Sequence, residues 1–291
     1  MLIALIAGVG FYRAAWGEER IVYTQIEPGA ITHEQKVEAA FANVEALLQA
    51  PTAGKVSFYG KDGERFRRGA GVAQILPEGA APGTTGAVQG VVVAAATGGL
   101  AYQEIDGLEA VLTPNHLLNM DLTKLLSQSG SVKKLERVQA GEAFAKMVDN
   151  LVQTYAFIHL PNLDGINMGK NLTLRVSGKL ESAKILRKSE NPLGVVVEFP
   201  HFLDSTVQYR RQSVDWITSS PVQGLLLPKS ALVQQGDKQG VYAVVGGLIR
   251  FKEVGVLDQD TQRVCVKGLT EGGLVVINPR SDLEGKRAVK N

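Results

Sequence analysis

The stretch "GKVSFYGKDGE" (residues 54–64) and the stretch "GGLAYQEIDGL" (residues 98–108) share one pattern at an offset of 44 residues. Each begins with a glycine, continues as an alternating strand with an aromatic residue in the same place, and ends at an Asp-Gly turn. The matched positions are Gly54 with Gly98, Val56 with Leu100, Phe58 with Tyr102, and Asp62-Gly63 with Asp106-Gly107. The repeat predicts two halves that pair into a flattened β-sandwich. The alternative is coincidence, because short strands rich in glycine, valine and aromatic residues resemble one another in any β protein.

The segment that joins the two halves, residues 77–90, reads "PEGAAPGTTGAVQG". Its composition of glycine, proline, alanine and threonine predicts a loop, and it contains no heptads of a coiled coil. No lysine occurs between Lys61 and Lys124.

The composition is that of an ordinary globular protein. The 291 residues are 45% hydrophobic and 21% charged, and the formal net charge is +2 with both signs interspersed. This balance gives no sign of a nucleic-acid-binding stripe. The single cysteine, Cys265, has alternating apolar neighbours and is expected to be a small apolar residue in a strand.

The N-terminus is the most apolar part of the chain. Twelve uncharged residues precede Arg13, and Tyr12 and Trp16 stand where interfacial aromatic residues belong. We interpret residues 1–17 as a membrane anchor, complete or cut short by a late start. The alternative is a buried strand or helix that begins a soluble domain.

The remainder of the chain divides by periodicity. The run from His33 to Ala50 fits either an amphipathic helix or a pair of strands. Residues 114–150 are the most helix-like region and include "AGEAFAKMVDNLVQ" (140–153). From residue 151 onward, β-branched and alternating runs separated by turns predict strands, and their regular spacing after residue 222 is typical of a small β domain.

No residue pattern predicts catalysis or a metal site. The four histidines, His33, His116, His159 and His201, are scattered and form no ligand pair. The segment "DGINMGKN" (164–171) is one residue short of a phosphate-binding loop and is expected to be a β-turn. The basic cluster "RFRRG" (65–69) is expected to be a solvated turn or a contact with anionic lipid or a partner.

Residues 50–75 and 91–114 resemble the two halves of a biotinyl/lipoyl-type domain. The same fold without the cofactor lysine occurs in the hemolysin-D-type membrane fusion proteins, which are periplasmic adaptors. The run "GLLLPKSALV" (224–233) and the run "QRVCVKGLTEGGLVVINP" (262–279) are similar to that family's later strands. One departure is clear, because the helical hairpin that efflux adaptors usually insert between the lipoyl halves has no counterpart in residues 77–90.

The resemblance implies a mainly β fold made of serial small β domains, with an N-terminal anchor and a short helical region. The expected order is a membrane anchor (1–17), the first part of a membrane-proximal domain (18–49), a lipoyl-like barrel-sandwich hybrid (50–114), a helical connecting region (115–150), a β-barrel (151–221) and the membrane-proximal β domain (222–291).

The resemblance also implies a function. It predicts a non-catalytic adaptor on the extracytoplasmic side of the cell membrane that docks to a transporter or an envelope protein, as a homo-oligomer, with no cofactor, metal or nucleic acid. The expected contact surface comprises the loop 77–90 and five residues of the lipoyl-like rim: Gly54, Arg65, Arg67, Arg68 and Gly98. The alternatives are an all-β protein that binds a small ligand or polysaccharide and a degenerate carrier domain.

Overall fold

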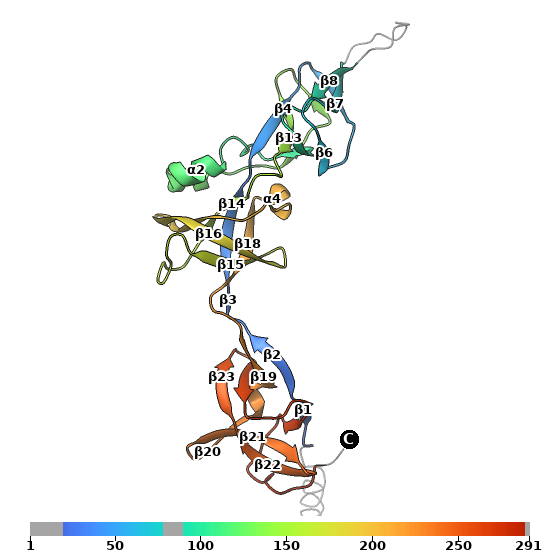
Figure 1. The fold of residues 1–291 in the computed structure, drawn as a ribbon. Coiled ribbons are helices and arrows are strands. Elements are labelled where there is room, and N and C mark those ends of the chain that lie inside the picture. The colour runs from blue at the N-terminus through green and yellow to red at the C-terminus, as the bar shows by residue number, and fades with distance from the viewer. Residues whose placement is uncertain (1–19, 78–89, 289–291) are drawn as a thin grey trace, which may run out of the picture. The chain divides into compact units, whose positions relative to one another are not determined.

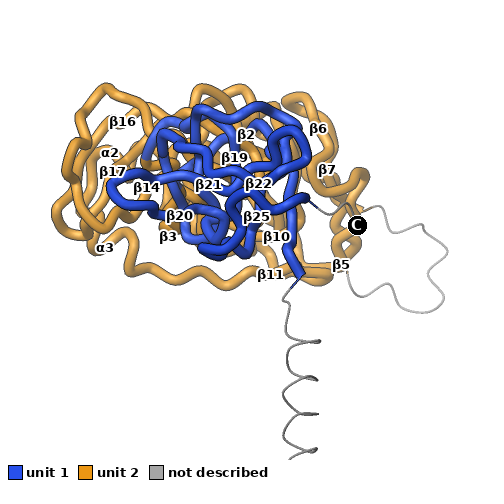
Figure 2. The backbone as a smooth tube through the Cα atoms, turned by 90° about the horizontal axis from the view of Figure 1, so that it is seen from below, with its two compact units in different colours: residues 1–33, 219–291 blue, residues 34–218 orange. Residues whose placement is uncertain are grey.

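The computed structural model describes residues 20–77 and 90–288. The expected anchor at 1–17 and most of the expected contact loop lie outside the described residues. Two compact units are present, one comprising residues 1–33 and 219–291 and the other residues 34–218 (Figure 2). Among the described residues, no helix is both long enough and apolar enough to cross a membrane.

The first unit is built from both ends of the chain. One sheet has the order β1-β25-β21-β20, with β22 also paired to β21, and the other has the order β2-β19-β24-β23. The bounds are β1 (Tyr23–Gln25), β25 (Leu274–Val276), β21 (Lys238–Val245), β20 (Leu232–Gln235), β22 (Leu248–Glu253), β2 (Glu27–Ile31), β19 (Val222–Pro228), β24 (Arg263–Lys267) and β23 (Gly255–Gln259), with a 3₁₀ turn at Lys229–Ala231. Val241, Val264 and Val275 are fully buried in its core, as expected for alternating β-branched strands that each contribute one face.

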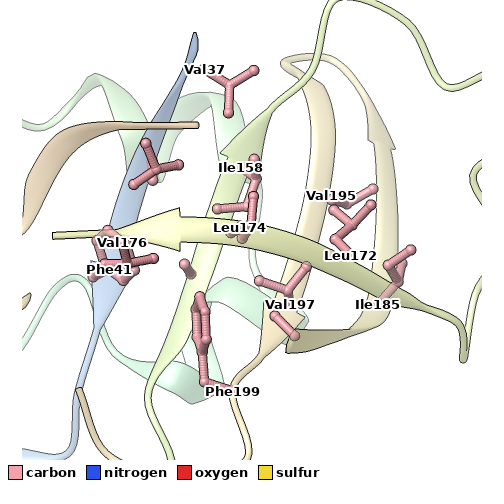
Figure 3. Packing of buried hydrophobic residues seen from close by; sticks show 14 of the residues in the cluster. Val37, Phe41, Ile158, Leu172, Leu174, Val176, Ile185, Val195, Val197 and Phe199 are labelled. Atoms are coloured by element: carbon pink, nitrogen blue, oxygen red, sulfur yellow. The ribbon is translucent and has the colours of Figure 1, made fainter. Parts of the chain in front are cut away.

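A closed six-stranded barrel forms part of the second unit (Figure 1). Its strands follow the order β14 (Tyr155–His159), β17 (Leu193–Glu198), β16 (Lys179–Glu190), β15 (Asn171–Val176), β18 (Arg211–Ile217) and β3 (Glu34–Ala42). Inward side chains from every strand fill the barrel, and the rings of Phe41 and Phe199 lie 5.9 Å apart in the core (Figure 3). The barrel is therefore a packed core and not a channel.

Strand β3 resolves the ambiguity at residues 33–50 in favour of a strand pair, β3 and β4 (Glu45–Gln49). The position of β3 also differs from the expected domain limits, which grouped residues 18–49 with the membrane-proximal domain. The structure places β3 between β14 and β18, where it closes the barrel. The physical reason is that a barrel needs partners on both edges of every strand, and sequence order does not show which distant segment supplies the last one.

The rest of the second unit contains two four-stranded sheets. The first has the order β12 (Arg137–Val138), β5 (Gly54–Phe58), β7 (Gly71–Leu76), β8 (Val91–Ala94), and the second has the order β4, β13 (Ala143–Val148), β9 (Gly99–Tyr102), β6 (Glu64–Phe66). Each sheet takes strands from both halves of the repeat. Val72, Ile75, Phe144 and Met147 form the shared core. The prediction of two interlocked halves in a flattened sandwich is confirmed.

The register of the repeat differs from the predicted offset by one residue. Gly54 is opposite Val138 on β12, and Gly99, not Gly98, is opposite Phe66 on β6. A Cβ atom at Gly54 would lie 2.2 Å from the Leu76 carbonyl oxygen, and one at Gly99 would lie 2.2 Å from the Val148 carbonyl oxygen. The true offset is therefore 45, because the equivalent glycines are those that the neighbouring backbone crowds. A shift of one residue exchanges the two faces of a strand.

The predicted helical region 114–150 is only partly helical. It contains α2 (Pro114–Asn119) and α3 (Leu122–Ser127), preceded by β10 (Glu104–Ile105) and followed by β11 (Lys133–Lys134). The expected helix over residues 140–153 is wrong, because Ala143–Val148 is strand β13 in the middle of a sheet. A strand buried on both faces shows a continuous apolar run, which periodicity does not distinguish from a short buried helix.

Two barrel arginines hold the short helices in place. Arg187 on β16 donates from Nη1 to the carbonyls of Leu117, Leu118 and Met120, at 2.9–3.2 Å, and so caps the end of α2. Arg211 donates from Nη2 to the carbonyls of Leu126 and Gln128, at 2.7 Å each, at the end of α3. A guanidinium at a helix C-terminus satisfies carbonyls that have no partner within the helix.

The Arg187 cap gives a testable expectation. In Arg187→Met, backbone amides of residues 114–127 should exchange at least tenfold faster, because loss of hydrogen bonds to a charged donor costs about 1.5–3 kcal/mol. Hydrogen–deuterium exchange measures this directly. Lys188→Met is the matched control, since Lys188 is the exposed neighbour on the same strand. Equal protection in both variants would show that the cap is not needed.

Candidate interaction site

Four of the five expected rim residues lie together in the second unit. Arg65 is on β6, and Arg67 and Arg68 follow it in the turn toward β7. Gly98 lies beside that turn, and a Cβ atom added there would be 3.8 Å from the Arg68 nitrogen. The turn is closed by a hydrogen bond from the Gly69 N–H to the Ala95 carbonyl, at 2.8 Å. The structure thus places three guanidinium groups on one short segment.

The three arginines are exposed and form no ion pair with any residue in the described part of the chain. Phe66 between them points into the sandwich core, which orients its neighbour Arg65 outward because side chains alternate along a strand. Unpaired guanidinium groups bind carboxylates and phosphates well. This rim can therefore bind an anionic surface.

Gly54 does not belong to the rim. It lies in the other sheet, is buried, and is required there because a Cβ would clash with the Leu76 carbonyl. The expectation for Gly54 as a contact residue is corrected to a packing role.

A buried charge cluster lies where the sandwich meets the barrel, and sequence reasoning did not find it. Arg210, the residue before β18, donates from Nη2 to Glu45 on β4 at 2.8 Å and from Nε to Asp106 at 2.8 Å. Lys146 on β13 has its Nζ 3.3 Å from Glu45 and 3.7 Å from Glu109. The Glu45 and Arg210 side chains are 0% and 3% exposed. Charges removed from water in this way are tolerated only when they are paired.

The carboxylate of Glu109 is held by its own turn. It accepts the N–H groups of Asp106 and Gly107, at 2.7 and 2.9 Å, while Asp106 accepts the Leu108 N–H at 2.9 Å. These bonds fix the 106–109 turn against the barrel residue Arg210. Within the described residues, Glu45 Oε1 and Arg210 Nη1 are buried without a hydrogen-bond partner.

The surroundings set the protonation states in the cluster. Burial by itself would raise the pKa of Asp106, but the hydrogen bond and the charge of Arg210 outweigh it and hold that pKa below its usual range. Burial would lower the pKa of Arg210, yet the charge of Glu45 and the bonds to both carboxylates raise it. Both groups of the Arg210–Asp106 pair are therefore charged at neutral pH.

The lowered pKa of Asp106 predicts a dependence of stability on acid. A carboxylate whose pKa is lower in the folded state contributes stability above its unfolded pKa, about 3.9, and loses it as the pH falls through the folded value. The difference in unfolding free energy between the wild type and Asp106→Asn should therefore shrink as the pH falls from about 5 to about 2. Urea denaturation at several pH values measures it. A difference that stays constant with pH contradicts the assignment.

A small cavity of about 80 Å³ lies beside the cluster, and Asp62, Tyr102, Lys146 and Val207 are among its lining residues. It has room for a few water molecules but not for an organic ligand. Tyr102 donates to Asp204 at 2.6 Å, and burial together with this bond raises the pKa of Tyr102. The cavity is part of the junction between sandwich and barrel and not a substrate site.

The other sequence candidates have structural roles. His33 pairs with Asp258 at 2.9 Å, and His201 pairs with Glu181 at 3.3 Å. No group of three metal-ligating side chains occurs in residues 20–77 and 90–288. Cys265 is buried in β24, as expected, and burial raises the pKa of its thiol. Residues 164–170 form turns.

One signal in the sequence could have revealed the charge cluster. The strand "AFAKMV" contains Lys146 in an otherwise apolar run, and a lysine in a buried strand requires a carboxylate partner. The partners themselves, Glu45 and Glu109, lie in distant segments and gave no such signal.

The comparisons with known proteins agree with this geometry. Residues 45–149 match the family model described as "RND related, barrel-sandwich hybrid domain". This segment is a barrel-sandwich hybrid domain. The match confirms the predicted lipoyl-like fold and its resemblance to the membrane fusion proteins, and it extends the domain beyond the expected limits of 50–114 to include β4 and β13.

Two solved structures are similar to this chain at low identity. ZneB from Cupriavidus metallidurans is 14% identical with a TM-score of 0.33, over 91% of this chain and 94% of ZneB. MacA from Actinobacillus actinomycetemcomitans is also 14% identical with a TM-score of 0.33, over 87% of this chain and 98% of MacA. No curated protein sequence matches the chain. The assignment therefore rests on the barrel-sandwich hybrid domain.

Proposed function

We propose that this chain is an adaptor that docks to a membrane transporter or an envelope assembly on the extracytoplasmic side of the cell membrane. The observation that carries the proposal is the barrel-sandwich hybrid domain at residues 45–149, which matches the domain of RND-related proteins. The apolar N-terminal segment 1–17 supports anchoring at the membrane. The proposed mechanism is geometric, because small β domains in series hold a partner at a fixed distance from the membrane.

The proposal assigns no catalytic step to this chain. A carrier domain needs a lysine on the connection between β7 and β8, and no lysine occurs between Lys61 and Lys124. The same connection, residues 77–90, has no heptads for a helical hairpin. These two features favour docking over cofactor transfer and over a long helical conduit.

We assign the partner contact to Arg65, Arg67, Arg68 and Gly98. The three guanidinium groups have no partner of their own in the described part of the chain, and the neighbouring glycine leaves room for a close approach. The expected partner surface is acidic, on the transporter, on an envelope protein or on a further copy of this chain. The first unit, with residues 20–33 and 219–288, is proposed as the membrane-proximal domain.

The first test is membrane attachment. Full-length protein should pellet with membranes, whereas a variant that lacks residues 1–17 should stay in the supernatant, because those residues supply the apolar segment. Full-length protein in the supernatant would overturn the adaptor proposal and favour a soluble binding protein for a small ligand or polysaccharide.

The second test concerns the rim. Arg67→Glu combined with Arg68→Glu should reduce co-purification of a co-expressed partner transporter at least tenfold, because a like-charge contact costs several kcal/mol. Lys238→Glu is the control, since that side chain is 66% exposed in the other unit. Equal recovery in both variants would remove the rim from the contact.

A further inference from the structure

The barrel-sandwich hybrid domain has two equivalent outer faces, and the described residues of the chain cover only one of them. The two sheets can be compared position by position. Gln74 on β7 lies opposite Ser57 on β5, and Lys146 on β13 lies opposite Tyr102 on β9, so Gln74 and Lys146 occupy equivalent positions. Lys146 is buried, and its Nζ donates to the Val207 carbonyl of α4 (Ser205–Gln208) at 3.4 Å. At Lys146, the outer face of the second sheet is thus covered by α4.

The outer face of the first sheet has no such cover among the described residues. Val92 lies on β8 opposite Gln74 and is 53% exposed, and Tyr59 is also 53% exposed. Both lie over Gly71, where an added Cβ atom would be 3.0 Å from Val92 and 3.1 Å from Tyr59. A glycine at this point makes the surface flat and leaves an apolar patch next to the end of a sheet.

This patch lies at an open strand edge. Among the strands formed by residues 20–77 and 90–288, β8 is the last of its sheet and pairs only with β7 (Figure 1). Beyond β8, the described backbone donates from Ala95 to the Ala70 carbonyl, which is again on the β7 side. An apolar edge without charges of its own is a template for an added strand.

The surrounding charges indicate what kind of strand fits. At one end of β8, the turn that carries Arg67 and Arg68 is bonded to Ala95. A segment bound along β8 would therefore meet apolar groups on the sheet face and positive charge at the end next to that turn.

We propose that β8 and the outer face of the first sheet bind an extended segment of a partner protein that is apolar on one face and carries acidic residues at the end next to Arg67 and Arg68. The segment adds to the sheet by backbone hydrogen bonds with the free edge of β8, and its apolar side chains cover Val92 and Tyr59. Its acidic side chains pair with Arg67 and Arg68. This inference rests on the proposed adaptor function, for which it gives the chemistry of one partner.

The test uses a probe of defined sequence with the full-length protein in mild detergent. The probe is a fluorescent eight-residue peptide that alternates valine and glutamate, and its control replaces the glutamates by lysines. The wild type should bind the acidic peptide at least tenfold more tightly than the basic one. Val92→Lys should weaken that binding at least tenfold, because a lysine on an edge strand opposes strand addition.

The domain supplies a matched control variant. Leu47 on the edge strand β4 pairs with Lys146, as Val92 on β8 pairs with Gln74. Leu47→Lys therefore places the same change at the equivalent, 36% exposed position of the second sheet. Leu47→Lys should bind the acidic peptide as the wild type does. Equal loss in both variants, equal binding of both peptides or no binding at all would overturn the inference.

Two further experiments distinguish the partner segment from other ligands of this surface. Self-association of the wild type that Val92→Lys abolishes would assign the edge to a second copy and overturn the proposal. Val92-dependent pelleting with vesicles of anionic phospholipid, for a chain without residues 1–17, would assign it to a lipid surface. Peptide binding in a protein that fails the membrane-attachment test would support the surface while rejecting the adaptor function.

Discussion

Replacing Arg210 by methionine is expected to lower the free energy of unfolding by about 3–5 kcal/mol, because it leaves buried carboxylates without a counter-charge. Arg210 neutralises Glu45 and Asp106 at 2.8 Å each, and the remaining cation, Lys146, is 3.3 Å from Glu45. Without Arg210, the carboxylates of Glu45, Asp106 and Glu109 would share one ammonium group in a largely buried site. Urea denaturation of the second unit, followed by circular dichroism, measures the loss.

The control for this prediction is a partly exposed ion pair in the same unit. Arg175 bonds to Glu34 at 2.6 Å, and both side chains are about one-third exposed. Arg175→Met should therefore lower stability by less than about 1 kcal/mol. A loss of similar size in both variants would show that burial does not decide the strength of these pairs.

Gly99→Ala is expected to destabilise the barrel-sandwich hybrid domain by about 3 kcal/mol, at the upper end of the usual cost of overpacking. The added Cβ would lie 2.2 Å from the Val148 carbonyl oxygen and 2.9 Å from its carbon. Val148 is the last residue of β13 and pairs with Leu100 on β9, so its carbonyl cannot move aside without disturbing the ladder between β9 and β13. Thermal denaturation would measure the effect as a lower midpoint.

The neighbouring glycine provides the control for Gly99→Ala. At Gly98, the Cβ of an alanine would be 3.8 Å from its nearest backbone atoms, which is an ordinary contact distance. Gly98→Ala should therefore change stability by less than about 0.5 kcal/mol. If Gly98→Ala is the more damaging variant, the register with an offset of 45 is wrong and that with an offset of 44 is right.

The repeat shows how far sequence comparison reaches. Similar residue types at 54–64 and 98–108 were enough to predict two halves of one sandwich, since both contain the glycine, the alternating strand and the turn. The two stretches align Gly54 with Gly98 because most residue types match at an offset of 44. Backbone crowding chooses Gly99 instead, and crowding depends on strands β7 and β13, which sequence similarity between the two stretches does not include.

Strand β13 shows a second limit. Its residues favoured a helix in sequence because apolar side chains occur at helical spacing in the longer run 140–153. In the structure, β4 and β9 pair with it on both sides and its two faces are covered, so any apolar residue is suitable at nearly every position.

The sequence by itself determined the fold class, the paired halves of the sandwich and the absence of a cofactor lysine between them, because these depend on residue types and their local spacing. The tertiary structure decided which glycine is equivalent to Gly54, which strand closes the barrel, and which charges meet Arg210 in the interior. Each of these depends on contacts between segments far apart in the chain, such as Glu45 with Arg210. Such contacts follow from how sheets pair and cover one another, and no local pattern encodes them.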